Sequence, residues 1–253
     1  MSAKKIIPCL DFKDGKVVKG VHFEGLREMG DPVEMAASYC QAGADELVFL
    51  DISATTEERD TLVDMVKKVA EKATVPFTVG GGIKSMEDVE RILAAGANKV
   101  GINSAAVQNP NLIVEASKKF GSNSIVAAVD AKLATDGTWH VMTHGGQKDT
   151  RLDVIAWSKK LEQLGAGSIL LTSVDRDGVK DGYDLKLTKA IVDAVSIPVI
   201  ASGGCGNAEH IVEVFKQTNV AAALAASIFH ENTTSIQDVK QLCLNQGVKM
   251  NES

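Results

Sequence analysis

The sequence predicts one (β/α)₈ barrel domain that spans residues 1–253. Short apolar segments recur along the whole chain with helical stretches between them, as alternating parallel strands and helices require. Several of these segments, such as IVAAV and ILLTS, are apolar on both faces, which is typical of strands covered on both sides. The chain holds 253 residues, 45% of them hydrophobic, which is enough for one large core and too few for two comfortable α/β domains.

Eight segments qualify as strands, and in chain order they read KIIPCLDF, ELVFLDI, PFTVGGG, NKVGIN, SIVAAVDA, SILLTSV, PVIASGG and VAAALAAS. Two of the connectors, 61–73 and 86–95, repeat their apolar residues with a helical period and carry charges on one face. Four expected helices end at glycines, as is common where positive φ follows a helix: Gly43, Gly96, Gly121 and Gly165. Eight such units in about 250 residues favour a closed barrel over an open doubly wound sheet.

The composition excludes several classes of protein. The net charge is −6 and no block of basic residues occurs, which argues against a nucleic-acid or membrane surface. No apolar run approaches the roughly 20 residues that cross a bilayer, and no signal peptide precedes the first strand, so we expect a cytoplasmic protein. The four cysteines contain no C-x-x-C pair, so we expect reduced thiols at Cys9, Cys40, Cys205 and Cys243. We expect neither a metal nor a cofactor.

The two halves of the chain resemble each other. QAGADELVFLDIS, which begins at Gln41, aligns without gaps on QLGAGSILLTSVD, 122 positions later. The same offset carries PFTVGGG onto PVIASGG. Two ungapped matches at one offset predict a barrel made of two fused half-barrels, at about 1–122 and 123–253, and a site with approximate two-fold symmetry.

Each half contains a strand that ends in small residues and is followed by a helix, at Gly80-Gly81-Gly82 and at Ser202-Gly203-Gly204. Glycines let backbone N–H groups approach an anion, and a helix N-terminus adds a favourable field. The next strand of each half ends in short residues, which are Asn103 and Ser104 in the first half and Ala226 and Ser227 in the second. A single such glycine run more often only permits a tight turn. Its duplication predicts a substrate with a phosphate group at each end.

Asp11 ends the first expected strand and Asp130 ends the fifth, which places them across the barrel mouth from each other. Two carboxylates over a partly apolar floor can act as general acid and general base on one substrate. Alternatively, each aspartate only accepts hydrogen bonds from loop backbone. We expect the other strand-end aspartates, Asp51, Asp175 and Asp177, to order loops or bind substrate hydroxyls.

Two connections are longer than the rest. The first, 11–32, is rich in glycine and has the length of a mobile lid, in which Lys19 could reach a phosphate or an oxyanion or simply lie at the surface. The second, 130–150, is expected to form a small β-hairpin. His140 and His144 there would share one face of a strand, a spacing that suits a metal pair but also occurs by accident.

These motifs, in this order, resemble the cyclase subunit of imidazole glycerol phosphate synthase, from histidine biosynthesis. The resemblance covers nearly the whole chain and rests on KIIPCLDFKDGKVVKGV, GDPVEMAASY, GADELVFLDISA, PFTVGGGI, VGINSAAV, VDAK, THGG, GAGSILLTSVDRDG, DGYD, PVIASGG and ALAASIFH. It implies that ammonia adds to the open-chain ribulose arm of a bis-phosphorylated aminoimidazole carboxamide nucleotide. Ring closure and cleavage would then yield imidazole glycerol phosphate and an aminoimidazole carboxamide ribonucleotide.

The resemblance also implies roles for individual residues. The catalytic pair of the family falls on Asp11 and Asp130, and its lid lysine on Lys19. Thr172 and Ser202 would line the pocket between the phosphate groups. The residues that would bind the two phosphate groups are Gly82, Asn103 and Ser104 in the first half and Asp177, Gly178, Gly204 and Ser227 in the second.

The resemblance further implies a partner, a glutaminase subunit that forms a heterodimer by docking at the N-terminal ends of the strands and sends ammonia along the barrel axis. Lys5, Glu46 and Lys99 match the charged ring that would gate this entrance, although strand ends can also simply be solvated. The fourth member departs from the family, since Ser168 stands where an acidic residue is frequent.

Three other positions depart from the usual pattern. His22 stands where asparagine is frequent, Arg151 replaces a small residue, and the segment QTNVA lacks a helix-ending glycine. The nearest rival function is the isomerase that precedes the cyclase in the same pathway, against which VVKGV and THGG count. Other phosphate-binding barrels fit less well, and intact Asp11, Asp130 and Lys19 argue against a catalytically silent scaffold.

Overall fold

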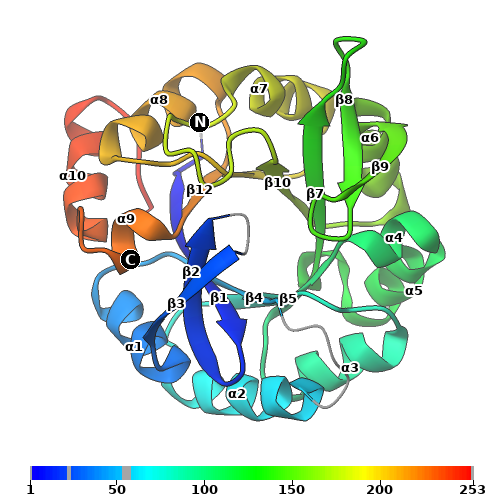
Figure 1. Cartoon of the computed structure of the whole chain (residues 1–253), viewed down its shortest axis with the longest axis horizontal. Coiled ribbons are helices and arrows are strands. Elements are labelled where there is room, and N and C mark those ends of the chain that lie inside the picture. The colour runs from blue at the N-terminus through cyan, green and yellow to red at the C-terminus, as the bar shows by residue number, and fades with distance from the viewer. Residues whose placement is uncertain (1, 22–23, 53–57, 252–253) are drawn as a thin grey trace.

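The computed structural model describes residues 2–21, 24–52 and 58–251. Within these ranges, eight parallel strands form a closed ring, and the last strand pairs back with the first (Figure 1). In ring order they are β1 (Lys5–Lys13), β4 (Leu47–Asp51), β5 (Phe77–Gly80), β6 (Lys99–Ile102), β7 (Ile125–Leu133), β10 (Ser168–Ser173), β11 (Val199–Ser202) and β12 (Ala222–Ala225). The predicted (β/α)₈ barrel is confirmed, and each of the eight predicted strands is present.

Helices surround the ring on its outer side (Figure 1). They are α1 (Pro32–Gln41), α2 (Glu58–Lys72), α3 (Met86–Ala94), α4 (Ser104–Gln108), α5 (Asn111–Phe120), α6 (Val154–Leu164), α7 (Leu185–Ala194), α8 (Ala208–Thr218), α9 (Ser227–His230) and α10 (Ile236–Asn245). The helices expected at 61–73 and 86–95 correspond to α2 and α3. None of the described helices is both long and apolar enough to span a bilayer.

The ends of the helices follow local rules. The four glycines that were expected to end helices all have positive φ, between 85° and 117°. Helix α8 ends differently, because Asn219 adopts the left-handed conformation (φ 58°) that glycine would otherwise supply. The missing glycine in QTNVA therefore has a structural substitute, and Nζ of Lys4 bonds both oxygens of Asn219 at 3.1 and 2.8 Å.

Side chains of the barrel strands alternate between two apolar layers. One layer fills the barrel interior, and the other lies between the strands and the helices. The interior layer consists of Ile7, Cys9, Val48, Val126, Leu170, Ile200, Ala222 and Leu224. Burying a large aliphatic side chain stabilises the fold by roughly 1.5–3 kcal/mol relative to leaving it exposed, so this alternation fixes the register of every strand.

Two antiparallel ribbons extend from the barrel at the ends of β1 and β7. Strand β1 continues into β2 (Lys16–Val21) and β3 (Glu24–Gly30), where the sequence predicted a glycine-rich loop. The loop prediction is wrong in form, because β2 pairs with β1 and β3 pairs with β2, which organises these residues as strands. Strand β7 continues into β8 (Trp139–Thr143) and β9 (Lys148–Asp153), which confirms the predicted hairpin.

The second ribbon corrects the prediction for its two histidines. His140 lies in β8, where Nδ1 is 3.0 Å from Asp149 and Nε2 is 3.4 Å from Asp136. His144 follows the end of β8 with φ 55°, so the two histidines do not share a strand face. Arg151, one of the departures from the family pattern, also has positive φ (60°), and its N–H donates to Asp149 at 2.7 Å.

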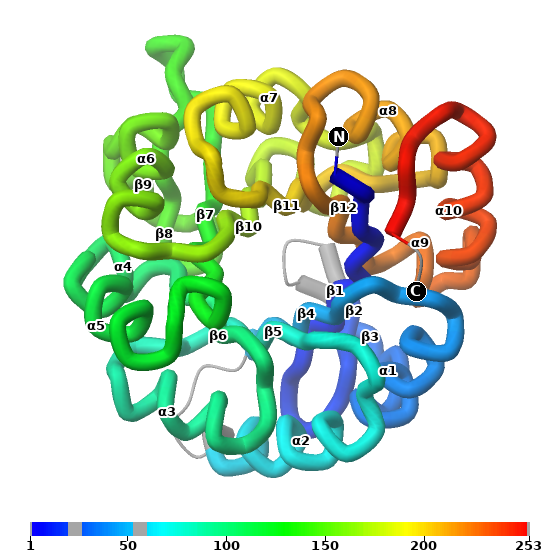
Figure 2. Tube along the Cα trace, turned by 180° about the vertical axis from the view of Figure 1, so that it is seen from behind, coloured from blue at the N-terminus to red at the C-terminus, as the bar shows by residue number. Residues whose placement is uncertain are grey.

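Both ends of the described chain are held together at the end of the barrel away from the two ribbons (Figure 2). Lys4 pairs with Met250 through a parallel bridge. Asp45, whose side chain is fully buried, accepts hydrogen bonds from Ile6 N–H at 2.8 Å, from Lys240 Nζ at 2.8 Å and from Asn251 Nδ2 at 2.9 Å. One carboxylate therefore joins the first strand, the last helix and the C-terminal segment.

We expect Asp45→Ala to destabilise the fold strongly, because it removes the fully buried carboxylate that binds Ile6, Lys240 and Asn251. The expected loss is roughly 3–5 kcal/mol in the free energy of unfolding, measured by urea denaturation. Asp193→Ala is the control, since its ion pair with Lys189 is exposed and should contribute less than about 0.5 kcal/mol. Similar losses in the two variants would contradict a special role for Asp45.

Candidate active site

Asp11 and Asp130 lie on opposite sides of the barrel mouth. Asp11 is in β1 and Asp130 in β7, and three strands separate them in either direction around the ring. Each occupies a position whose side chain points into the barrel. Asp11 lies on the same strand face as Ile7 and Cys9, and Asp130 on the same face as Val126. The two carboxyl groups therefore project into the barrel where it opens toward the ribbons.

Burial alters the ionisation of both carboxyl groups. It raises the pKa of Asp11 to about 6, while the Lys19 ammonium lowers that pKa and the Asp177 carboxylate raises it further. Burial also raises the pKa of Asp130 to about 6, opposed by a hydrogen bond from Nδ2 of Asn103 at 3.0 Å and assisted by Asp177. Near neutral pH each group can therefore exchange a proton, as general acid–base catalysis requires.

The first glycine run forms a tight turn after β5. Gly81 and Gly82 have positive φ (93° and 68°), and a Cβ on Gly81 would lie 2.0 Å from the carbonyl oxygen of Asp51. A larger residue does not fit there, because the backbones of two strand ends approach closely. Ser85 caps α3 with a reciprocal capping box, so the turn leads directly into a helix N-terminus.

The second glycine run repeats this arrangement after β11. Gly203 and Gly204 have φ of 91° and 100°, and a Cβ on Gly203 would lie 2.8 Å from the carbonyl oxygen of Ser173. Asn207, 122 positions after Ser85, caps α8. The division into two half-barrels stays a prediction, and these equivalent turns and caps support it.

The short helices α4 and α9 begin beside the two glycine runs. Their N-cap residues, Asn103 and Ala226, share an unusual backbone, with φ/ψ of −115°/−101° and −125°/−69°. Ser104 and Ser227 are the first helical residues. Ser104 Oγ accepts a hydrogen bond from His144 N–H at 3.1 Å, which leaves its own proton able to point at an anion.

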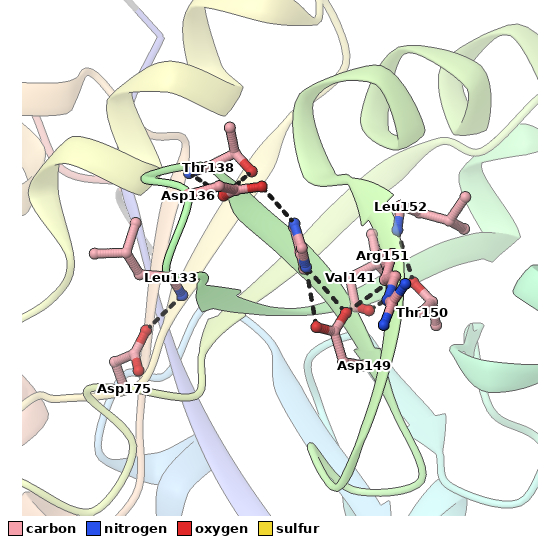
Figure 3. Close-up of polar contacts among 10 residues, drawn as sticks. Leu133, Asp136, Thr138, Val141, Asp149, Thr150, Arg151, Leu152 and Asp175 are labelled. Carbon is pink, nitrogen blue, oxygen red and sulfur yellow. Dashed lines mark hydrogen bonds and ion pairs between the residues drawn. The ribbon is translucent and has the colours of Figure 1, made fainter.

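The remaining predicted site residues lie around the same mouth. Thr172 pairs with Asp130 on one side and with Ser202 on the other, so the three are level across adjacent strands. Asp177 and Gly178 follow β10, and Gly178 has φ of 78°. Asp175 orders the backbone, as expected, by accepting a hydrogen bond from Leu133 N–H at 2.8 Å (Figure 3).

A charged group occupies the other end of the barrel. Nζ of Lys5 and Nζ of Lys99 lie 2.7 and 2.9 Å from the two oxygens of Glu46. Burial opposes the ionisation of Glu46, but the two lysines outweigh it and lower the pKa of this carboxyl. Ser168 begins β10 and brings no charge to this end. Two cations thus share one carboxylate.

Sequence reasoning missed one buried network next to the site. His230, at the end of α9, donates from Nε2 to the carbonyl oxygen of Cys9 at 2.8 Å, and its Nδ1 accepts from the Tyr39 hydroxyl. Burial lowers the pKa of His230 to about 4, so its ring is neutral. The sequence showed only an isolated histidine, because its partners lie 191 and 221 positions away.

Comparison with known proteins identifies the family. A family model described as "Histidine biosynthesis protein" matches residues 5–235. Two relatives named imidazole glycerol phosphate synthase subunit HisF, from Bacillus cereus strains Q1 and AH187, are each 58% identical over 250 residues and cover 99% of both chains. The chain belongs to the HisF family.

Membership of the HisF family confirms the resemblance seen in the sequence. Of the departures from the family pattern, Asn219 and Arg151 both adopt left-handed backbone, and His22 lies outside the described residues. Within the described residues, no cluster of three or more His, Cys, Asp or Glu side chains could hold a metal ion.

The raised pKa of Asp130 predicts that this carboxylate destabilises the fold at neutral pH. A carboxyl with a pKa near 4 in the unfolded chain and about 6 in the folded chain loses stability as the pH rises through this interval. Asparagine does not ionise, so Asp130→Asn should be more stable than the wild type by about 1–3 kcal/mol at pH 7.5. Urea denaturation should show the difference shrink at pH 4.5, and a constant difference would contradict the raised pKa.

Proposed function

We propose that Asp11 and Asp130 act as the acid and base of the cyclase reaction of imidazole glycerol phosphate synthase. The chain is the cyclase subunit of this synthase, an enzyme of histidine biosynthesis, since it matches HisF subunits over nearly its whole length. One observation carries the residue assignment. Two buried carboxyl groups, each with a pKa of about 6, face one mouth from opposite sides.

The chemistry requires two proton-transferring groups. Addition of ammonia to the ketone carbon of the ribulose arm leaves an oxyanion that needs a proton, and this oxygen must leave as water when a C=N bond forms. Ring closure with cleavage then removes protons from nitrogen and carbon. A carboxyl group with a pKa near the working pH can serve either role, and groups on opposite sides can serve both in turn. Lys19, which already influences Asp11 electrostatically, can stabilise the developing oxyanion.

The two glycine runs would hold the two phosphate groups of the substrate. Their positive-φ turns and the adjacent helix N-termini present backbone N–H groups, which bind anions without a cluster of basic side chains. Thr172 and Ser202 would contact the middle of the substrate. The proposed phosphate contacts are Gly82, Asn103 and Ser104 on one side and Asp177, Gly178, Gly204 and Ser227 on the other.

A subunit of a synthase implies a partner subunit. The partner we propose is a glutaminase that releases ammonia at the end of the barrel opposite the aspartates. Lys5, Glu46 and Lys99 would gate the entrance there, because opening it requires an ion pair to separate. Ammonia would then pass along the barrel axis to the aspartates.

Asp11→Asn and Asp130→Asn should each lower kcat by at least about 10², the usual contribution of one general acid or base. The assay supplies the purified chain with the bis-phosphorylated aminoimidazole carboxamide nucleotide and ammonium, and detects both products. Substrate binding should persist, since neither aspartate belongs to the proposed phosphate contacts. Near-normal turnover in both variants would sink the assignment.

Glu46→Ala and Lys99→Ala should lower turnover with glutamine and the partner subunit while sparing turnover with free ammonium. Ammonium bypasses the docked subunit, so only the coupled reaction depends on the gate. Lys189→Ala, which removes an exposed ion pair with Asp193, is the control and should affect neither activity. Parallel losses in both assays would mean that the charged group supports folding of the barrel instead.

A further inference from the structure

The carboxylate of Glu231 joins two segments that border the barrel mouth. Glu231 directly follows α9. Its Oε1 lies 3.4 Å from Nη2 of Arg27 in β3, and its Oε2 lies 2.9 Å from Nζ of Lys180, between β10 and α7. The Glu231 side chain is 31% exposed and that of Arg27 72%, so the carboxylate is the better-fixed partner.

The contact with Arg27 leads to the first ribbon. In the antiparallel ladder of β2 and β3, Arg27 is directly opposite Lys19. A contact that holds Arg27 in place therefore also restrains β2 at Lys19, because residues directly opposite each other in a ladder are neighbours across the two strands. The Lys19 ammonium influences Glu231 at the rim and Asp11 in the mouth, and it lowers the pKa of both carboxyl groups.

The contact with Lys180 leads to the second glycine run. Lys180 comes two residues after Gly178 and has positive φ (65°), which is costly for a non-glycine residue. Its carbonyl oxygen lies so close to Gly206 that a Cβ there would be 2.2 Å away. Lys180 thus packs over the turn between Gly204 and α8, and its side chain holds Glu231.

We propose that Glu231 is a positioning residue that holds the β2–β3 ribbon, and with it Lys19, in register with the second phosphate segment. The proposal rests on the proposed function, because it assigns Lys19 and that segment to one active site. One carboxylate serves both contacts, so a phosphate group that orders the Lys180 segment also orders the residue that holds Arg27. Such coupling places Lys19 over the substrate when the substrate is bound.

The test compares Glu231→Gln with Glu28→Gln. The control removes a more exposed ion pair of the same ribbon, Lys16 with Glu28 at 2.8 Å, which joins β2 to β3. In the assay with ammonium, Glu231→Gln should lower kcat about fivefold, the kinetic equivalent of weakening its contact with Arg27, and change KM less. Glu28→Gln should leave kcat within about twofold of the wild type.

A double-mutant cycle tests the route through Arg27. If Glu231 acts on catalysis by holding Arg27, Arg27→Gln should also lower kcat, and the double variant should lose little more than Glu231→Gln alone. Additive losses would show that the two residues act separately and would overturn the proposal.

A titration of the free enzyme tests the position of Lys19 without turnover. Three titratable groups interact electrostatically with Asp11. They are Lys19 in β2, Asp177 in the segment after β10, and the Cys9 thiol in β1 itself. Because Lys19 lowers the pKa of Asp11, release of the ribbon in Glu231→Gln should raise that pKa, as measured by carbon-13 NMR of the carboxyl groups. Asp130, which responds to burial, Asn103 and Asp177, is the internal reference and should not move.

The outcomes separate this proposal from the proposed function. An unchanged kcat and an unchanged Asp11 titration in Glu231→Gln would overturn the positioning role, as would equal losses in Glu231→Gln and Glu28→Gln. If the wild-type chain forms no product, the proposed function fails. The Asp11 titration then still decides whether Glu231 positions Lys19.

Discussion

The alternation of side chains along strands in a closed ring is the constraint on which the site depends. In β1 the inward positions run from Lys5 through Ile7 and Cys9 to Asp11, so one strand carries a gate candidate, two core residues and a catalytic candidate. A slip of one residue would turn Ile6 and Leu10, which now face the helices, into the barrel. The apolar layers therefore hold the charges at both ends, and the core decides where the chemistry can occur.

This placement has an electrostatic cost for the fold. Asp11 and Asp130 are taken out of water beside a third carboxylate, Asp177, in a chain whose net charge is already −6. A substrate with two phosphate groups would add more negative charge. In the proposed site, backbone N–H groups at the glycine turns and the Lys19 ammonium would offset part of this charge without a basic patch.

Local patterns predicted more of this structure than distant contacts did. The eight strands and the glycine turns were recognisable because apolar runs and glycines act within a few residues. The β2–β3 ribbon was not, since KVVKGV and EGLREMG lack a clear alternation. The first becomes a strand by pairing with β1, and the second by pairing with β2. Glu231 was missed for the same reason, because its partners lie 204 and 51 positions away. Left-handed Asn219 shows that a departure from a family pattern can keep the same backbone.

The two ribbons also explain how similar carboxyl groups can take different roles. Asp11 and Asp130 each lie where a barrel strand continues into a ribbon, and burial brings each to a pKa of about 6. The groups that oppose this rise in pKa differ. The long Lys19 side chain of β2 lowers the pKa of Asp11, whereas Asp130 accepts a hydrogen bond from Asn103. The ionisation of Asp11 therefore depends on the position of a ribbon side chain, whereas that of Asp130 depends on an amide at the end of β6.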